Sequence, residues 1–324
     1  MKRPPVEKNA LSGLINKQRR CILSSIMDTQ NTQQQTILIA GLGLLGGSLG
    51  LALSQLPVRR LGWARKELTR SQALQKNIAD EVFSSLEEAL PQADIVVLAL
   101  PVPVIIEMLP LCARVCQKGA IVTDIGSIKS RIITAAEQVF TSPEGPFFIG
   151  SHPMAGTEKS GIDAAFATLY DNADVFITPC TRAPEEAVLK LEGVWQALTC
   201  HTERISALRH DQLVAETSHA QHVVASALSL SILDHRDEAE KMARYRGCAT
   251  GFKDTSRIAS SSPLMWREIV EHNAPAVLEA LDAFEKSLQE YRRLIESGDF
   301  DGFEKRFARG KELRDAWLKY KGMK

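Results

Sequence analysis

The chain has 324 residues, of which 44% are hydrophobic and 24% charged, and its 39 basic and 39 acidic side chains cancel to a formal net charge of zero. This composition is typical of a globular protein of about two domains, and the charge balance argues against a nucleic-acid partner or a strongly basic membrane-binding face. The six scattered cysteines, including the helically spaced Cys112 and Cys116, do not complete a zinc site, and no apolar run approaches the about 20 residues of a membrane span. We therefore predict a cytoplasmic protein with reduced thiols and with no metal, membrane or nucleic-acid partner.

Residues 1–35 are polar and poorly periodic, and they end in a run rich in glutamine, asparagine and threonine. Such a composition favours a disordered, solvated extension over a packed element. An organelle-targeting peptide is the alternative, because apolar and basic residues mix between positions 9 and 27. Met27 is a second candidate for the true start.

A strand, a glycine-rich turn and a helix are expected where the regular pattern begins. Thr36–Ala40 is a short apolar run, residues 41–46 are GLGLLG, and an apolar helical pattern continues through Leu53. In a dinucleotide-binding unit the three glycines permit a tight turn, close approach of the diphosphate, and close packing of the helix on the strand. The helix N-terminus would face the phosphates, although a glycine turn without a ligand has the same local pattern. We predict cofactor contacts from Gly41, Leu42, Gly43, Leu44, Leu45 and Gly46.

The second strand, expected at residues 59–63, is followed by Ala64, Arg65 and Lys66. An NAD-binding unit places a carboxylate here to accept the ribose hydroxyls, whereas cations accommodate the additional 2′-phosphate of NADP. The sequence therefore predicts that NADP is the preferred cofactor and NAD a poorer one. The alternative is a solvated basic turn.

Strand and helix patterns alternate from there to residue 206. We expect strands at 94–100, 120–124, 173–178 and 202–206, and helices at 104–116, 158–169 and 184–198. This alternation predicts an α/β, Rossmann-like, doubly wound sheet with mostly parallel strands. Turns after two of these strands place Leu100, Pro101 and Ser127 at the edge where such sheets bind ligands.

The segment from Gly150 to Gly161 brings together an imidazole, hydroxyls, a carboxylate and an ammonium group. It follows the apolar run 147–149, so His152 is expected just past the end of a strand. A neutral imidazole near pH 7 can take the proton of a substrate hydroxyl, while Glu158 or Lys159 would complete or gate the pocket. A histidine that only satisfies loop backbone groups is the structural alternative.

From Ala207 to the end at residue 324 the pattern is helical. Apolar residues recur in steps of four and three after the N-cap signal at Ser262-Pro263, which predicts a long helix with a seam that needs a partner. Burial of the seam within one subunit and a homodimer interface are equally compatible with this pattern. The seam consists of Val270, Ala274, Val277, Leu281, Phe284, Leu288, Tyr291 and Ile295.

Two further groups could meet His152. His219 and His222 share one helical face, and a hydrogen-bonded pair is favoured over metal ligands because no further cluster accompanies them. Lys253 and Arg257 lie in a stretch expected to break the helical run, residues 251–257. Arg257 presents a planar fork suited to a carboxylate, with an exposed structural salt bridge as the alternative.

Taken together, these motifs closely resemble those of the prephenate/arogenate dehydrogenase family of tyrosine biosynthesis. The resemblance spans about residues 36–295 and is carried by GLGLLG at 41–46, TDIGS at 123–127, GSHPMAGTEKSG at 150–161, SHAQH at 218–222, and GFKDTSR at 251–257 with Trp266. The chain departs from the family at Ala220-Gln221, where Leu-Pro is frequent between the two histidines, and this leaves the role of His222 open.

The resemblance implies a nicotinamide-binding domain (36–206), a helical dimerisation and substrate domain (207–324), and oxidative decarboxylation of a cyclohexadienyl acid in an active site between them. It implies that His152 is the catalytic histidine, that Ser127 lies beside it near the nicotinamide, and that Arg257 binds a substrate carboxylate. The other expected substrate contacts are His219, His222, Lys253 and Glu158. If His222 donates a hydrogen bond to a keto oxygen, prephenate is favoured over arogenate.

Two other functions share these features. A two-domain NADP-dependent dehydrogenase of the β-hydroxyacid or 6-phosphogluconate type would use a lysine in the helical half, for which Lys253 is the candidate. A non-catalytic NADP-binding dimer would keep the fold without needing His152, Ser127 or Arg257.

Overall fold

The computed structural model describes residues 34–157 and 159–322. The predicted disordered extension is outside the described residues up to position 33, and so are Met27 and Glu158. The described chain falls into two compact units, of which the first ends at Asn273 and the second is Ala274–Lys324. Each unit is considered by itself.

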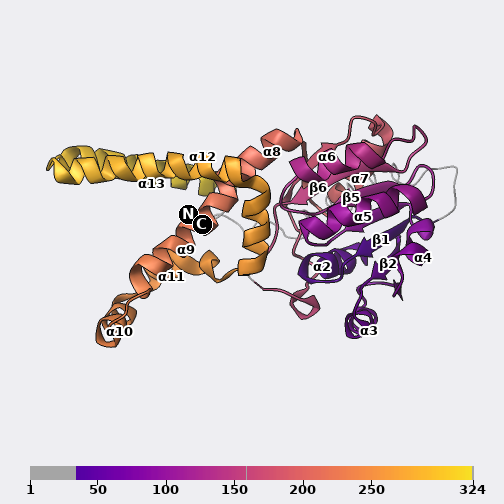
Figure 1. Cartoon of the computed structure of the whole chain (residues 1–324), viewed down its shortest axis with the longest axis horizontal. Helices are drawn as coiled ribbons and strands as arrows, with labels where there is room; N and C mark the ends of the chain where they lie inside the picture. The colour runs from indigo at the N-terminus through magenta and orange to yellow at the C-terminus, as the bar shows by residue number, and fades with distance from the viewer. Residues whose placement is uncertain (1–33, 158, 323–324) are drawn as a thin grey trace, which may run out of the picture. The chain divides into compact units, whose positions relative to one another are not determined.

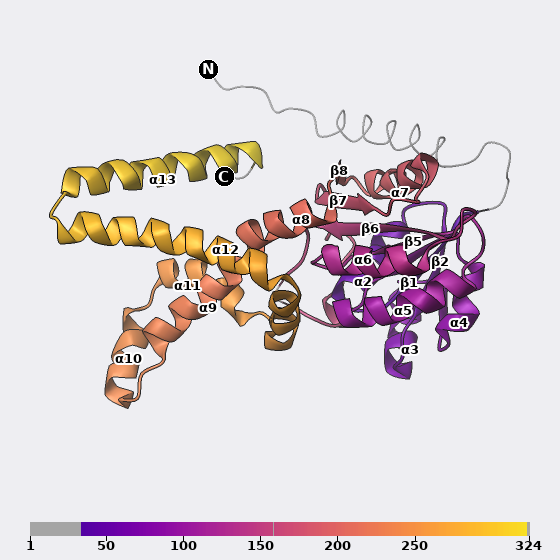
Figure 2. The same ribbon diagram turned by 45° about the horizontal axis from the view of Figure 1, so that its top comes forward.

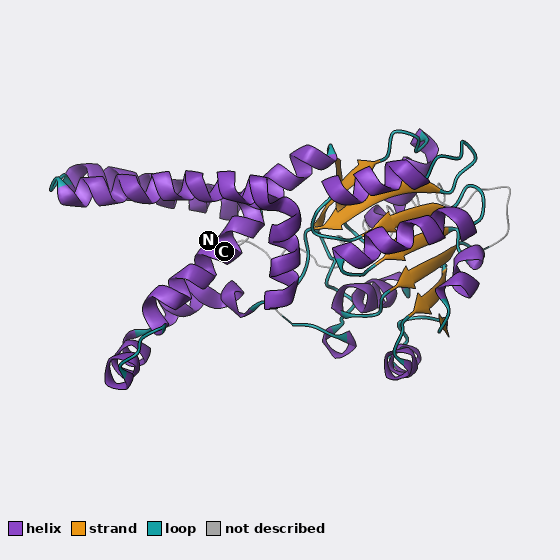
Figure 3. Cartoon of the chain, viewed as in Figure 1, coloured by secondary structure: helices purple, strands orange, loops and turns teal. Residues whose placement is uncertain are grey.

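The first unit is built on a sheet, whose strands are orange in Figure 3. Its described strands run in the order β3-β2-β1-β4-β5-β6-β7-β8. Every neighbouring pair is parallel except β6 and β7. The predicted doubly wound, mostly parallel sheet is confirmed. The strands are β1 (Thr36–Ala40), β2 (Arg59–Trp63), β3 (Glu81–Phe83), β4 (Ile95–Leu98), β5 (Ile121–Asp124), β6 (Phe147–Pro153), β7 (Asp174–Pro179) and β8 (His201–Arg204). The sequence did not predict β3, because three residues are too short to show a period.

Helices cover both faces of this sheet (Figure 1). Successive side chains of a strand point to opposite faces. Ile37 and Ile39 accordingly share one hydrophobic core with α2, α3 and α7, while Leu38 and Ala40 share another with α4, α5 and α6. These helices are α2 (Leu44–Leu53), α3 (Glu67–Gln75), α4 (Leu86–Ala89), α5 (Val102–Val115), α6 (Ser130–Val139) and α7 (Glu185–Ala197), with a 3-10 turn at Leu90–Gln92.

The helix predicted at 158–169 is wrong. The described part of this segment holds only a 3-10 turn at Ile162–Ala164, preceded by Gly161 at φ +85°. A residue with positive φ cannot be part of a right-handed α-helix, so Gly161 interrupts the predicted helix. The segment instead crosses α2, where the buried Tyr170 hydroxyl donates to the Leu45 carbonyl at 2.9 Å.

After β8 the described chain is entirely helical, which confirms the predicted fold class. The elements are α8 (Ala207–Val214), a π-helical turn (Ala215–His219), α9 (Ala220–Leu233), α10 (Glu238–Gly247), α11 (Thr250–Ser256), a 3-10 turn (Arg257–Ser260), α12 (Pro263–Glu296) and α13 (Phe300–Tyr320). The prediction that residues 251–257 break the helical run is therefore wrong, because residues 251–256 form most of α11. Strands give way to helices at the predicted position near residue 206, but the compact units divide at Asn273. The predicted domain boundary stays a prediction.

The division falls at a kink in α12, where Asn273 has φ −132° and Pro275 follows. The predicted seam is thus interrupted after Val270. In the second unit the rest of α12 runs antiparallel to α13 (Figure 2), and Tyr291 packs on Phe303 with ring centroids 5.5 Å apart. Phe284 and Leu288 of the seam are 44% and 57% exposed, so α13 covers only part of it.

In the described segments, no helix has both the length and the apolarity needed to cross a membrane.

Candidate active site

The glycine-rich turn lies where the strand order reverses, between β1 and β4. Gly41 has φ +106°, and a Cβ on Gly46 would come within 1.9 Å of the Gly41 carbonyl oxygen, so the turn and α2 need both glycines. A Cβ on Gly43 would meet nothing within 4 Å, and no side chain caps the N-terminus of α2. A helix N-terminus that presents free N–H groups beside open space fits a diphosphate.

The loop after β4 meets this turn. A Cβ on Gly41 would lie 2.9 Å from Leu100 Cδ2, and the exposed Pro101 precedes α5. The structure thus brings the two predicted cofactor segments, residues 41–46 and 100–101, to one place at the carboxyl ends of β1 and β4. In open α/β sheets this switch point is where nucleotides bind.

The turn after β2 carries more positive charge than its three predicted residues suggest. Ala64 is buried, whereas Arg65 and Lys66 are exposed. Arg70 folds back from α3 and donates to the carbonyls of Ala64 and Arg65 at 3.0 and 2.8 Å. Arg70 therefore adds a third cation and fixes the backbone from which Arg65 projects.

Ser127 lies in the loop after β5, and a buried ion pair shapes this loop. The ammonium of Lys129 contacts Asp124 Oδ2 at 2.5 Å, with both side chains fully buried. It also donates to the carbonyls of Gly126 and Ile128, at 2.9 and 3.0 Å. These two carbonyls flank the partly exposed Ser127, so the pair sets where Ser127 stands.

His152 lies within β6 rather than beyond its end, because β6 continues to Pro153 by pairing antiparallel with β7. The expected position was wrong because the apolar run ends at Ile149, where the pairing of β6 with β7 begins and carries the strand on to Pro153. Its neighbour Ser151 points to the other face, where its hydroxyl contacts Thr123 Oγ1 at 2.9 Å and accepts from Trp195 Nε1 at 3.2 Å. This anchorage holds the strand that presents His152.

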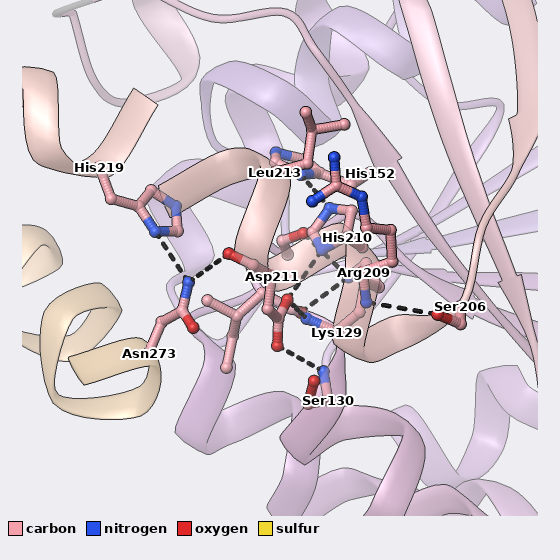
Figure 4. A network of polar contacts seen from close by, with 12 residues as sticks. Lys129, Ser130, His152, Ser206, Arg209, His210, Asp211, Leu213, His219 and Asn273 are labelled. Carbon is pink, nitrogen blue, oxygen red and sulfur yellow. Dashed lines mark hydrogen bonds and ion pairs between the residues drawn. The ribbon is translucent and has the colours of Figure 1, made fainter. Parts of the chain in front are cut away.

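A chain of hydrogen bonds leads from His152 into the protein interior (Figure 4). His152 Nδ1 lies 2.8 Å from His210 Nε2, and His210 Nδ1 lies 2.8 Å from Asp211 Oδ1. The carboxylate of Asp211 accepts from the backbone N–H groups of Lys129 and Ser130, at 2.7 and 2.8 Å, and so caps α6. Both His210 and Asp211 are buried.

Sequence reasoning missed His210, Asp211 and Lys129. A local signal did exist for the helix that carries the first two, because Ser206 caps the N-terminus of α8 by accepting from Arg209 N. Nothing local showed that this helix packs against the start of α6.

The half-buried His152 and the fully buried His210 are both held in their neutral form. Burial, with the nearby His210, Lys129 and His219, lowers the pKa of His152 well below its usual value. Burial also lowers the pKa of His210, partly opposed by its hydrogen bond to Asp211. Although burial alone raises it, hydrogen bonds from His210 and the backbone keep the pKa of Asp211 below its usual range. A neutral base beside an ionised carboxylate is the form needed to accept a proton near pH 7.

Trp266 of α12 brings together the two predicted histidines. Its ring stacks on His222 at 3.8 Å between centroids and meets the edge of His219 at 5.8 Å. Burial lowers the pKa of His219 to about 4, and Asn273 Nδ2 donates to its Nδ1 at 3.2 Å. His219 also acts on the pKa of His152, so this aromatic group adjoins the histidine chain.

His222 cannot be the expected donor while its ring is neutral. Its Nδ1 lies 3.0 Å from the carbonyl oxygen of Ser218, which can only accept, so Nδ1 carries the hydrogen and Nε2 accepts. Burial and the Arg257 guanidinium keep the pKa of His222 below its usual value. The argument that favoured prephenate through a donating His222 is therefore wrong. Because the Arg257 guanidinium lowers the pKa of His222, these two side chains lie near each other.

Lys253 is exposed on α11, and Glu158 lies outside the described residues. Across residues 34–157 and 159–322, no group of three or more histidine, cysteine, aspartate or glutamate side chains is arranged to hold a metal ion.

Family models and known proteins resemble both parts of the chain. Residues 50–204 match the model for the nucleotide-binding domain of prephenate dehydrogenase, and residues 206–309 match the model for its dimerization domain. Prephenate dehydrogenase of Bacillus subtilis is 34% identical over 90% of this chain and 79% of its own. Cyclohexadienyl dehydrogenase of Zymomonas mobilis is 31% identical over 86% of this chain and 94% of its own. The crystal structure of prephenate dehydrogenase from A. aeolicus, in complex with hydroxyphenyl propionate and NAD+, superposes with a TM-score of 0.78 at 30% identity, covering 90% of this chain and 100% of the other.

Proposed function

This chain belongs to the prephenate dehydrogenase family, and we propose that it catalyses the oxidative decarboxylation of a cyclohexadienyl acid, prephenate or arogenate, in tyrosine biosynthesis. The observation that carries the proposal is the placement of His152. Its Nδ1 is tied to a buried histidine, its pKa is lowered, and it stands on a strand whose neighbour β5 leads into the Ser127 loop.

His152 supplies the base that the reaction needs. The bound nicotinamide would accept the hydride from the ring carbon that carries the hydroxyl group. As that carbon becomes carbonyl-like, the hydroxyl proton must leave, and a neutral imidazole in hydrogen-bond reach takes it. Ser127 would orient the same hydroxyl beside the nicotinamide.

The substrate carboxylates require groups that stay charged or polar without changing protonation state. Arg257 is the proposed carboxylate ligand, because its guanidinium donates two parallel hydrogen bonds to a carboxylate. His219, His222 and Lys253 are the remaining proposed contacts from the described chain, and Glu158 is proposed with them. Arg257→Ala should mainly raise the KM for the substrate, by 10-fold or more, since a charged hydrogen bond is worth about 1.5–3 kcal/mol; an unchanged KM would assign Arg257 a structural role.

The proposed cofactor is NADP in preference to NAD, held by the residues from Gly41 to Gly46 and by the turn after β2. Ala64 removes the carboxylate that would repel a 2′-phosphate, and Arg65, Lys66 and Arg70 offer cations. Because these groups are exposed, we expect about a 10-fold preference in kcat/KM, shrinking as salt is raised. Ala64→Asp with Arg65→Ala should reverse it, whereas equal use of NAD by the unmodified protein would refute it.

We further propose a homodimer. The match of residues 206–309 to a dimerization domain supports it, as do the exposed apolar residues of α12 and α13, among them Leu288 and Phe307. Large exposed apolar surfaces of this kind mark protein interfaces.

The decisive experiment compares His152→Asn with His201→Asn, an exposed histidine of β8, as a matched control. Turnover of prephenate, arogenate and simple hydroxyacids is measured with both cofactors. His152→Asn should lower kcat by about 10²–10⁴, the usual range for a general acid–base group, with little effect on cofactor binding, and His201→Asn should match wild type. Wild-type turnover in His152→Asn, turnover only of simple hydroxyacids, or cofactor binding without any turnover would each contradict the proposal.

A further inference from the structure

We infer that His210 and Asp211 are positioning residues that fix the ring tautomer of His152, so that the proton of the substrate hydroxyl is taken by Nε2 of His152. The inference rests on the proposed function for the identity of the hydroxyl, and on hydrogen-bond geometry for the tautomer.

Asp211 determines which atom donates in each of the two hydrogen bonds that link it, through His210, to His152. Its carboxylate receives the backbone N–H groups of Lys129 and Ser130, at 2.7 and 2.8 Å, and stands 2.8 Å from His210 Nδ1. An ionised carboxylate has no hydrogen to donate. His210 must therefore donate from Nδ1.

The direction passes on to His152. With its hydrogen on Nδ1, a neutral His210 has only a lone pair on Nε2, and this atom lies 2.8 Å from His152 Nδ1. The contact is a hydrogen bond only if His152 Nδ1 donates. A neutral His152 then carries its lone pair on Nε2, to which no group in the described chain is hydrogen-bonded.

Packing keeps the two rings from turning to another arrangement. His210 is fully buried, Phe176 of β7 meets it with centroids 5.7 Å apart, and the His152 and His210 rings meet at 5.0 Å and 64°. Phe176 is also the residue directly opposite His152 in the β6–β7 pairing. Phe176 thus links the two histidines, because it pairs with His152 across the sheet and packs on the His210 ring of α8.

In this arrangement one proton moves from the substrate hydroxyl to His152 Nε2 and returns to the same oxygen at the end of the reaction. As hydride leaves the ring carbon for the nicotinamide, the hydroxyl proton moves to His152 Nε2, and the resulting imidazolium keeps donating from Nδ1 to His210. The carboxylate then leaves as carbon dioxide, and the electron pair of the broken C–C bond completes the aromatic ring. The phenolate oxygen takes the proton back from Nε2, so the protein ends the cycle unchanged.

Two substitutions at His210 separate positioning from packing. The amide of Gln in His210→Gln can still donate to Asp211 and accept from His152, and so preserves the tautomer. His210→Leu fills the space without either bond. We expect His210→Gln to retain kcat within about 10-fold and His210→Leu to lose about 10²–10⁴, the scale on which a wrong imidazole tautomer acts in hydrolytic triads. The KM for the cofactor should not change in either.

Two readouts do not depend on stability. Nitrogen-15 NMR of histidine-labelled wild type at pH 7.5 should show His152 protonated at Nδ1 only, and His210→Leu should lose this single tautomer. In the pH profile of kcat, His210→Leu should shift the acid limb attributed to His152. The other groups facing this pair are unchanged in the variant: Lys129 and His219 act on His152, while Asp124, Lys129 and Asp211 act on His210.

Protonation of His152 at Nε2 in the wild type would overturn the inference, and so would wild-type kcat in His210→Leu. Equal losses in His210→Gln and His210→Leu with an unchanged NMR tautomer would also overturn it. Failure of the wild type to turn over prephenate or arogenate while NMR shows the Nδ1–H tautomer would contradict the proposed function but support the tautomer assignment.

Discussion

Replacing Lys129 with methionine is expected to destabilise the first unit by about 3–5 kcal/mol, the usual cost of leaving one partner of a buried ion pair uncompensated. Both side chains of the Lys129–Asp124 pair are fully buried. Asp124 Oδ1 already has no hydrogen-bond partner in the described chain, so after the substitution only the N–H of Gly126 would still contact the carboxylate, through Oδ2. A loss of this size should lower Tm by about 6–20 °C, at 2–4 °C per kcal/mol.

The pH dependence of this loss has a definite sign. Burial raises the pKa of Asp124 even beside Lys129, and removing the ammonium raises it further. Above the unfolded value of about 4, the unfolded chain releases the proton that the folded variant retains, so the free energy of unfolding falls as pH rises. The variant should therefore come close to the wild type near pH 4 and fall furthest behind near pH 7.5.

Scanning calorimetry at one fixed protein concentration measures this effect. Lys118→Met is the matched control, because Lys118 pairs with Glu144 on the surface and should contribute less than about 1 kcal/mol. Adding Asp124→Asn to Lys129→Met removes the buried charge and should recover part of the stability at pH 7.5. A loss below about 1 kcal/mol, or an equal loss at both pH values, would refute the reasoning.

Three other outcomes are expected. Gly43→Ala should weaken cofactor binding at unchanged Tm because its Cβ enters open space, whereas Gly46→Ala should also lower stability by about 1–3 kcal/mol because its Cβ meets backbone; calorimetry and cofactor titration check both, and a stable Gly46→Ala would contradict the packing argument. Since the pKa of His152 is lowered, kcat should stay level as pH falls past about 6.5, the ordinary histidine value, and an acid limb at or above that pH would count against a buried neutral base. Sedimentation at micromolar protein should show a dimer that Leu288→Lys dissociates, and a monomeric wild type would rule out the exposed apolar seam as an interface.

The sequence by itself determined the features that depend on neighbouring residues. The glycine turn, the basic turn after β2 and most strands are encoded by local periodicity and by glycine chemistry, so their positions followed from the pattern. The fold class and the family could be inferred because these local signals occur in a characteristic order along the chain. Local patterns failed in two places: β3 is too short to show a period, and the helical pattern at residues 158–169 was misleading because Gly161 adopts a positive φ that ends any helix there.

Only the tertiary structure decided which side chains meet His152. His210 lies 58 residues away in sequence, on a helix whose N-terminal signal says nothing about its neighbours. Asp211, which is hydrogen-bonded to His210, is held in place because α8 packs on the start of α6, where the backbone N–H groups of Lys129 and Ser130 need an acceptor. The tautomers of His152 and His222 likewise depend on which atoms face each ring nitrogen, and that is set by packing between segments that are distant in the chain.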